Sequence, residues 1–77
     1  MIIAVVHWID AHTIDEWTGL EDIKKQGLSE CKSVGILLYE DKEKVIITHT
    51  VGETDSCGNI VIPKRFIKAF NKREVKL

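Results

Sequence analysis

The strongest constraint on the fold lies in the middle of the chain, where two β-rich runs flank a short charged stretch. The runs are Ser33–Tyr39 and Val45–Thr50, and every residue between Glu40 and Lys44 is charged. β-branched and aromatic residues favour strands, whereas consecutive charges are costly to bury. The chain therefore reverses at the charged stretch, and the sequence predicts an antiparallel hairpin there.

The length and composition fit one small domain, residues 1–77. With 44% hydrophobic and 30% charged residues, the chain resembles an ordinary globular protein in composition, not a disordered or fibrous one. A core of this size supplies only about 3–5 kcal/mol of net stability. Small domains of this kind often gain further stability from a partner.

Four strands are expected near residues 2–9, 32–40, 44–51 and 58–62. Pro63 ends the fourth strand because proline has no N–H to donate. A tight 3₁₀-like turn over Pro63–Ile67 and a last strand through Val75 follow. This order favours a mostly β fold, a small SH3-like or Sm-like five-stranded antiparallel barrel with one short helix. A small α+β open sheet with the helix on one face is the alternative.

The short helix is expected after Thr18, which with Glu21 fits a capping box. Leu20 and Ile23 would face the core, and Gly27 would end the helix in the left-handed conformation. Two turns are all that the sequence allows.

The first strand has two apolar faces, since Ile3, Val5 and Ile9 alternate with Ile2, Ala4, Val6 and Trp8. One small core can cover only one of these faces fully. The sequence therefore predicts a homo-oligomer.

The apolar start of the chain is interrupted at His7, far short of the roughly 20 residues that span a bilayer, and it lacks a basic flank. It is expected to be a strand and not a signal or an anchor. We therefore expect a cytoplasmic protein without membrane contact, in which Cys31 and Cys57 are reduced thiols.

No complete catalytic or metal-binding motif is present. The three histidines and two cysteines have no spacing typical of a zinc site, and no nucleophile stands in a recognisable arrangement with a base. We expect no catalytic residues, no metal and no cofactor, and hence a protein that is not an enzyme.

The segment from Trp8 to Trp17 is the first candidate binding site, because it concentrates aromatic and polar side chains in a predicted loop. Either tryptophan could stack on a base, and Asp10, His12 and Thr13 could contact a base or ribose. The alternative is structural: Trp8 lies in the core, Asp10 caps the loop, and Trp17 seals the end of the barrel.

The C-terminal segment is the second candidate. The net charge is −1, but residues 63–77 contain six basic side chains and one acidic. Lys64 and Arg65 could hold a phosphate, since arginine binds phosphate through two parallel N–H groups. The alternative is that both cations are merely solvated. The overall charge makes nucleic acid an unlikely partner.

The residues in Trp8–Thr18, Ser33–Asp41 and Ile60–Lys64 together resemble a group of short proteins encoded in tailed phages and prophages. The likeness covers nearly the whole chain. It implies a small β fold, expression in an infected bacterial cytoplasm, and a non-enzymatic task such as counter-defence.

Two functions from different classes follow. The first is an oligomeric counter-defence protein that sequesters a small anionic nucleotide signal between subunits, with the loop and the basic turn on one surface. The second is a protein-interaction or assembly module that engages a host or phage protein. A weaker alternative is an Sm-like ring that binds RNA through the basic segment.

Overall fold

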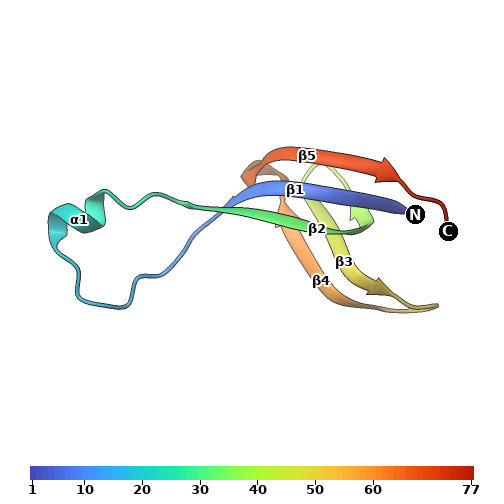
Figure 1. Cartoon of the computed structure of the whole chain (residues 1–77), viewed down its shortest axis with the longest axis horizontal. Helices are drawn as coiled ribbons and strands as arrows, with labels where there is room; N and C mark the ends of the chain where they lie inside the picture. Colours follow the sequence, from blue (N-terminus) through green and yellow to red (C-terminus); the bar gives the residue numbers. More distant parts are fainter.

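The computed structural model describes residues 1–77 and contains one five-stranded antiparallel sheet, one short α-helix and one 3₁₀ turn. The strand order is β4-β3-β2-β1-β5, so β4 and β5 form the two edges (Figure 1). The elements are β1 (Ile2–Asp10), α1 (Leu20–Lys24), β2 (Ser29–Glu40), β3 (Lys44–Val51), β4 (Ser56–Pro63), the 3₁₀ turn η1 (Lys64–Phe66) and β5 (Ile67–Glu74).

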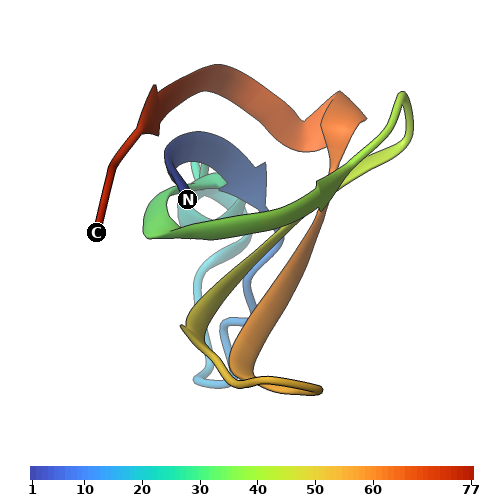
Figure 2. The same cartoon turned by 90° about the vertical axis from the view of Figure 1, so that its right-hand side faces the viewer.

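The sheet bends sharply in the middle of β2. The first part of β2 pairs with β1, the last part pairs with β3, and the register shifts between Leu37 and Tyr39. At Gly35 a Cβ atom would lie 2.8 Å from the carbonyl oxygen of Thr48, so only glycine allows the two strands to approach this closely. The two halves of the sheet consequently fold over each other, as Figure 2 shows.

The core lies between these two halves. Its fully buried apolar side chains alternate along β1, β3 and β4, as expected for one face of each strand: Ala4, Val6, Val45, Ile47 and Ile62. Trp8, Leu37, Ile60, Ile67 and Phe70 pack around them. The body of the protein is therefore a two-layered β structure with a small core.

The mostly β fold, the central hairpin and the 3₁₀ turn before the last strand are confirmed, but the expected closed barrel is wrong. β4 pairs only with β3 and β5 only with β1. Charged side chains occupy the mouth between the two halves, where Glu40 accepts hydrogen bonds from Lys64 and Lys72. The halves are joined here by ion pairs between side chains and not by backbone hydrogen bonds between β4 and β5, so the sheet stays open.

The expected helix exists, but its details differ. Thr18 makes no cap; its hydroxyl donates to the carbonyl oxygen of Glu16, and the N-cap residue is Gly19. α1 has five residues, ends at Lys24 with Lys25 as its C-cap, and leaves Leu20 78% exposed and Ile23 37% exposed. Gly27 has no positive φ. The helix lies away from the core, so neither apolar side chain could face it.

No helix of the chain is long and apolar enough to cross a membrane.

The molecule is elongated. Its radius of gyration is 16.0 Å, compared with about 11.5 Å for a compact domain of this length. Its dimensions are 52 × 22 × 21 Å, and the long axis runs from the body to α1 (Figure 1). The segment between β1 and β2 thus projects from the sheet.

Candidate functional site

The projecting segment, residues 11–28, is called the arm below. It starts where the pairing of Asp10 with Ser29 ends the β1–β2 ladder. The backbone hydrogen bonds of the arm are local, for example from the Ile23 N–H to the Gly19 carbonyl at 2.9 Å, and none joins the arm to the body. The arm is thus an irregular segment at the end of the β1–β2 hairpin, with a single helical turn near its tip.

The arm presents large apolar side chains to solvent. Trp17 is 103% exposed, Leu20 78% and Leu28 70%. A shallow hollow of about 270 Å³ lies on the arm and is lined in part by Ile14, Ile23 and Leu28. Aromatic and aliphatic side chains grouped on a projecting element are typical of a surface that another molecule covers.

The arm is also acidic. Residues 11–28 contain four carboxylates and two lysines, Lys24 and Lys25. Within this range only Glu21 has a cationic partner, Lys24, at 3.0 Å. Asp15, Glu16 and Asp22 make no ion pair within the chain, so their charges remain available to a partner.

The candidate binding residues of the segment from Trp8 to Trp17 lie in different environments in the structure. Trp8 packs against the core, and its Nε1 donates to the hydroxyl of Ser33 at 3.0 Å. Asp10 is exposed and accepts from the N–H of Ala11 at 2.9 Å. His12, Thr13 and Trp17 are exposed on the arm. Trp17 therefore does not seal the sheet, and Trp8 offers a partner only the part of its ring that the core leaves uncovered.

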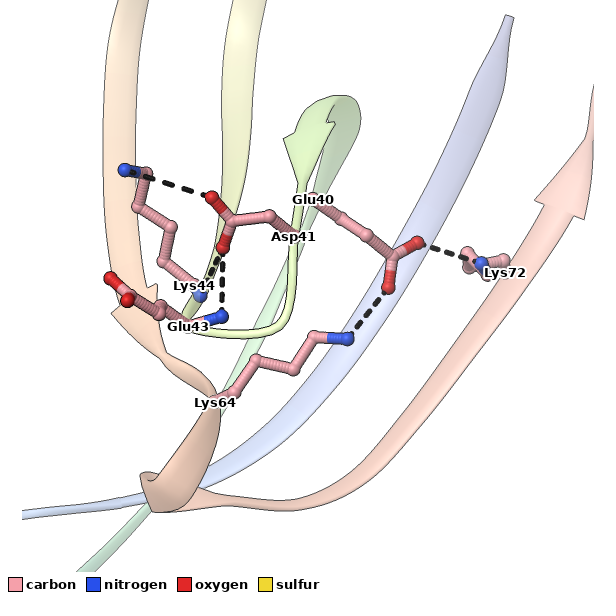
Figure 3. A network of polar contacts seen from close by, with 6 residues as sticks. All are labelled: Glu40, Asp41, Glu43, Lys44, Lys64 and Lys72. Carbon is pink, nitrogen blue, oxygen red and sulfur yellow. Dashed lines mark hydrogen bonds and ion pairs between the residues drawn. The ribbon is translucent and has the colours of Figure 1, made fainter.

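Lys64, the first cation of the basic turn, belongs to an ion-pair network between the β2–β3 turn and β5 (Figure 3). Its Nζ lies 2.9 Å from Glu40 Oε2, and Lys72 Nζ lies 2.8 Å from Glu40 Oε1. The hydrogen bonds from Lys72 and then Lys64 hold the pKa of Glu40 below its ordinary value. Lys64 is thus already paired within the chain, although it shares the one carboxylate of Glu40 with Lys72.

The β2–β3 turn beside this network is held by Asp41. One carboxylate oxygen accepts from the backbone N–H groups of Glu43 and Lys44, at 2.8 and 2.9 Å. These bonds, that from Glu43 first, lower the pKa of Asp41. The Lys64 N–H also donates to the Glu43 carbonyl at 2.8 Å, which ties the turn to η1. This end of the body is therefore firmly fixed.

Arg65 makes no ion pair. Its guanidinium carbon lies 5.3 Å from the centre of the Phe66 ring. Together with Lys42, Glu43 and Pro63 it lines an open hollow of about 440 Å³. Two cations and one carboxylate thus surround a space large enough for a small ligand.

The two candidate regions, Asp10–Trp17 and the basic turn with Lys64 and Arg65, do not share a cavity within one chain. The hollow beside Arg65 contains no residue of the arm, and the hollow on the arm contains no residue of η1. No hydrogen bond or ion pair links Asp10–Trp17 with Lys64 or Arg65. A common surface for both would require a second molecule.

Sequence reasoning found only part of one further feature, on the outer face of β1 and β5. Ile3, Val5 and Val75 line a hollow of about 430 Å³ together with Asn71, Lys72 and Arg73. Val34 pairs with Val5 and is 68% exposed. The apolar alternation of β1 pointed to this face, but nothing in the weakly patterned β5 sequence identified Arg73 as its rim.

Comparison of the chain with family models, curated proteins and solved structures gave no match. Its function therefore has to be inferred from its own residues.

The remaining polar clusters are small. Glu30 lies 3.1 Å from both His7 Nε2 and Lys68 Nζ, and these contacts, that of Lys68 first, lower its pKa. Cys31 lies on β2 and Cys57 on β4, and neither is bridged. No three His, Cys, Asp or Glu side chains come together as a metal site.

Proposed function

We propose that the chain is a non-enzymatic protein-interaction and assembly module that docks on another protein surface through its arm. The full exposure of Trp17, on the same arm as the exposed Leu20 and Leu28, carries this proposal. A fully buried side chain of this size contributes about 1.5–3 kcal/mol, and exposed tryptophans are frequent binding hot spots. The arm gains this free energy only when a partner covers it.

The resemblance to tailed-phage proteins extends the proposal. In that setting the module would act in the cytoplasm of an infected bacterium and would serve counter-defence by binding a protein or by assembling with itself. Neither role requires a cofactor.

Site-specific photo-crosslinking tests the proposal. A benzophenone side chain replaces Trp17, and a control carries the same group at Glu53, in the exposed β3–β4 loop at the far end of the body. We expect the group at position 17 to form a discrete adduct with another protein chain and the group at position 53 to form none. Absence of any adduct at position 17, or equal adducts at both positions, would contradict a role of the arm in docking.

Sequestration of a small anionic nucleotide is the second candidate, and the hollow beside Arg65 favours it. Arg65 and Lys42 line this hollow and neither makes an ion pair, so both could bind phosphate oxygens. A neighbouring copy could supply aromatic stacking through Trp17.

A thermal-shift titration with cyclic and linear nucleotides distinguishes the two candidates. A ligand at about 100 times its Kd adds about 2.7 kcal/mol, which raises the Tm of a domain this small by at least about 10 °C. Arg65→Ala should abolish the shift, whereas Lys76→Ala, near the C-terminus and outside the hollow, should retain it. No shift at millimolar nucleotide would contradict this candidate.

A further inference from the structure

We infer that the surface on which the arm docks is a second copy of this chain, and specifically the outer face of its β1 and β5. The two chains would lie antiparallel, so that each arm crosses the body of the other. The inference rests on the proposed function only in taking the arm as a docking element. It names the partner and the site on that partner.

The first argument is surface area. The chain exposes 6270 Å², whereas a compact monomer of 8.8 kDa exposes about 4800 Å². The excess is on the order of 1500 Å² for each chain. A stable protein interface buries about 1200–2000 Å² in total, and obligate dimers bury more. Two copies therefore carry enough surplus surface for a stable dimer.

The second argument is charge. Asp15, Glu16 and Asp22 on the arm have no cationic partner. The basic residues of the C-terminal segment that make no ion pair within the chain are Arg65, Arg73 and Lys76. A single chain thus leaves carboxylates unpaired at one end and cations unpaired on the body. An antiparallel pair brings these opposite charges together twice, as a twofold axis requires.

The third argument is the match of apolar surfaces. Ile3, Val5 and Val75 line one part of a hollow on the outer face, and Asn71, Lys72 and Arg73 line the rest. Trp17 and Leu20 form the apolar part of the arm, with Glu16 beside them in the sequence. In the dimer, Trp17 and Leu20 of one arm would contact the apolar part of the hollow, and Glu16 would lie near Arg73 of the other chain. This arrangement is typical of a protein interface with a hydrophobic centre and a polar rim.

The dimensions agree with this arrangement. The longest dimension of one chain, 52 Å, is more than twice the other two, 22 and 21 Å. The arm extends along this long axis, beyond the body, and is free to lie across a second chain. The apolar outer face of β1, which one small core leaves half uncovered, would be buried by the partner's arm.

Sedimentation and light scattering on the purified chain test the inference. We expect a dimer at micromolar concentration. Trp17→Ala should weaken self-association roughly a thousandfold, because a twofold dimer loses the binding hot spot at both arms. Arg73→Glu should weaken it as well, since it places a carboxylate opposite the acidic arm. The matched control is Val61→Ala, because Val61 is 57% exposed on the outer face of β4, the edge opposite β5.

The outcomes separate this inference from the proposed function. A monomer at 100 µM, or a dimer that Trp17→Ala and Arg73→Glu leave unchanged, overturns the inference. A larger oligomer overturns the twofold arrangement. If position 17 crosslinks to a different protein while the chain is monomeric, the inference fails and the proposed function stands. Crosslinks from position 17 to peptides of β1 or β5 of the same chain's sequence, recovered from dimers, support it directly.

Discussion

The inner face of the sheet and the arm contain similar apolar side chains but bury very different fractions of them. Ile47 and Ile62 are at most 2% exposed, while Leu20 and Leu28 are at least 70% exposed. The difference lies in the facing layer: the bent sheet covers its own inner face, and nothing in the chain covers the arm. The same residue type therefore stabilises folding in one region and remains available for binding in the other.

The largest effect on stability, and hence the strongest test of this comparison, is expected for a substitution in the core. Ile62→Ala should destabilise the fold by about 2–5 kcal/mol, because it leaves a cavity in a close-packed site. That loss is comparable to the entire net stability expected for so small a domain, so the variant should be largely unfolded. Circular dichroism during urea unfolding measures the change.

The control for this prediction is the neighbouring residue. Val61→Ala lies on the same strand but on the outer face, where Val61 is 57% exposed, and should change stability by less than about 0.5 kcal/mol. Equal losses for both variants would show that the outer face is also packed.

A second contrast compares one glycine of the body with one of the arm. Gly58 has a φ of 75°, and a Cβ there would lie 2.6 Å from the Cβ of His49. Gly58→Ala should therefore cost about 1–3 kcal/mol. Gly27→Ala should be neutral or slightly stabilising, since no atom lies within 4 Å of the added Cβ. Both values come from urea unfolding, and a neutral Gly58→Ala would contradict the close approach of β3 and β4.

The sequence predicted the parts of the fold that depend on local patterns. The hairpin around Glu40–Lys44 followed from charge and β propensity, and the 3₁₀ turn followed from Pro63. The open edge did not, because whether β4 and β5 pair depends on how far apart the bent sheet places these two strands, which no local pattern records. The capping box at Thr18 failed for a related reason: the pattern is compatible with a cap, but a five-residue helix without tertiary packing does not enforce one.

The candidate site was predicted in part. The concentration of aromatic and charged side chains before Trp17 identified the arm as a possible binding segment, and the two apolar faces of β1 pointed to its uncovered outer face. The pairing partner of Lys64 and the hollow rimmed by Arg73 could not be found this way, because both join residues that are distant in the sequence.

A third prediction concerns acid stability, to which the body contributes through Glu40. Its pKa in the folded chain lies below the ordinary value of 4.5 because Lys72 and Lys64 donate to it. The folded state therefore binds fewer protons, so the contribution is complete above about pH 4.5 and is lost as the pH falls toward the lowered pKa. Glu30 and Asp41 shift in the same direction.

The variant Glu40→Gln sharpens this prediction. It should lower the urea midpoint at pH 7 and have less effect near pH 3, because the wild-type carboxyl becomes increasingly protonated as the pH falls toward its lowered pKa. Glu53→Gln, in an exposed loop without an ion pair, should leave the midpoint unchanged at both values. A Glu40→Gln effect that does not shrink at low pH would mean that the charge of Glu40 does not stabilise the folded chain.

The smallest effect on folding is expected in the arm, and the two tryptophans allow a matched measurement. Trp17→Ala should change the free energy of unfolding by less than about 0.5 kcal/mol in solutions dilute enough to contain single chains, because Trp17 contacts nothing in its own chain. Trp8→Ala makes the same chemical change but removes packing on the core and the hydrogen bond to Ser33, and should cost more than about 2 kcal/mol. Urea unfolding followed by circular dichroism, repeated at rising protein concentration, separates folding from association. If Trp17→Ala costs as much as Trp8→Ala in dilute solution, the arm packs on its own body. If its cost grows only with protein concentration, the arm is stabilised by another copy.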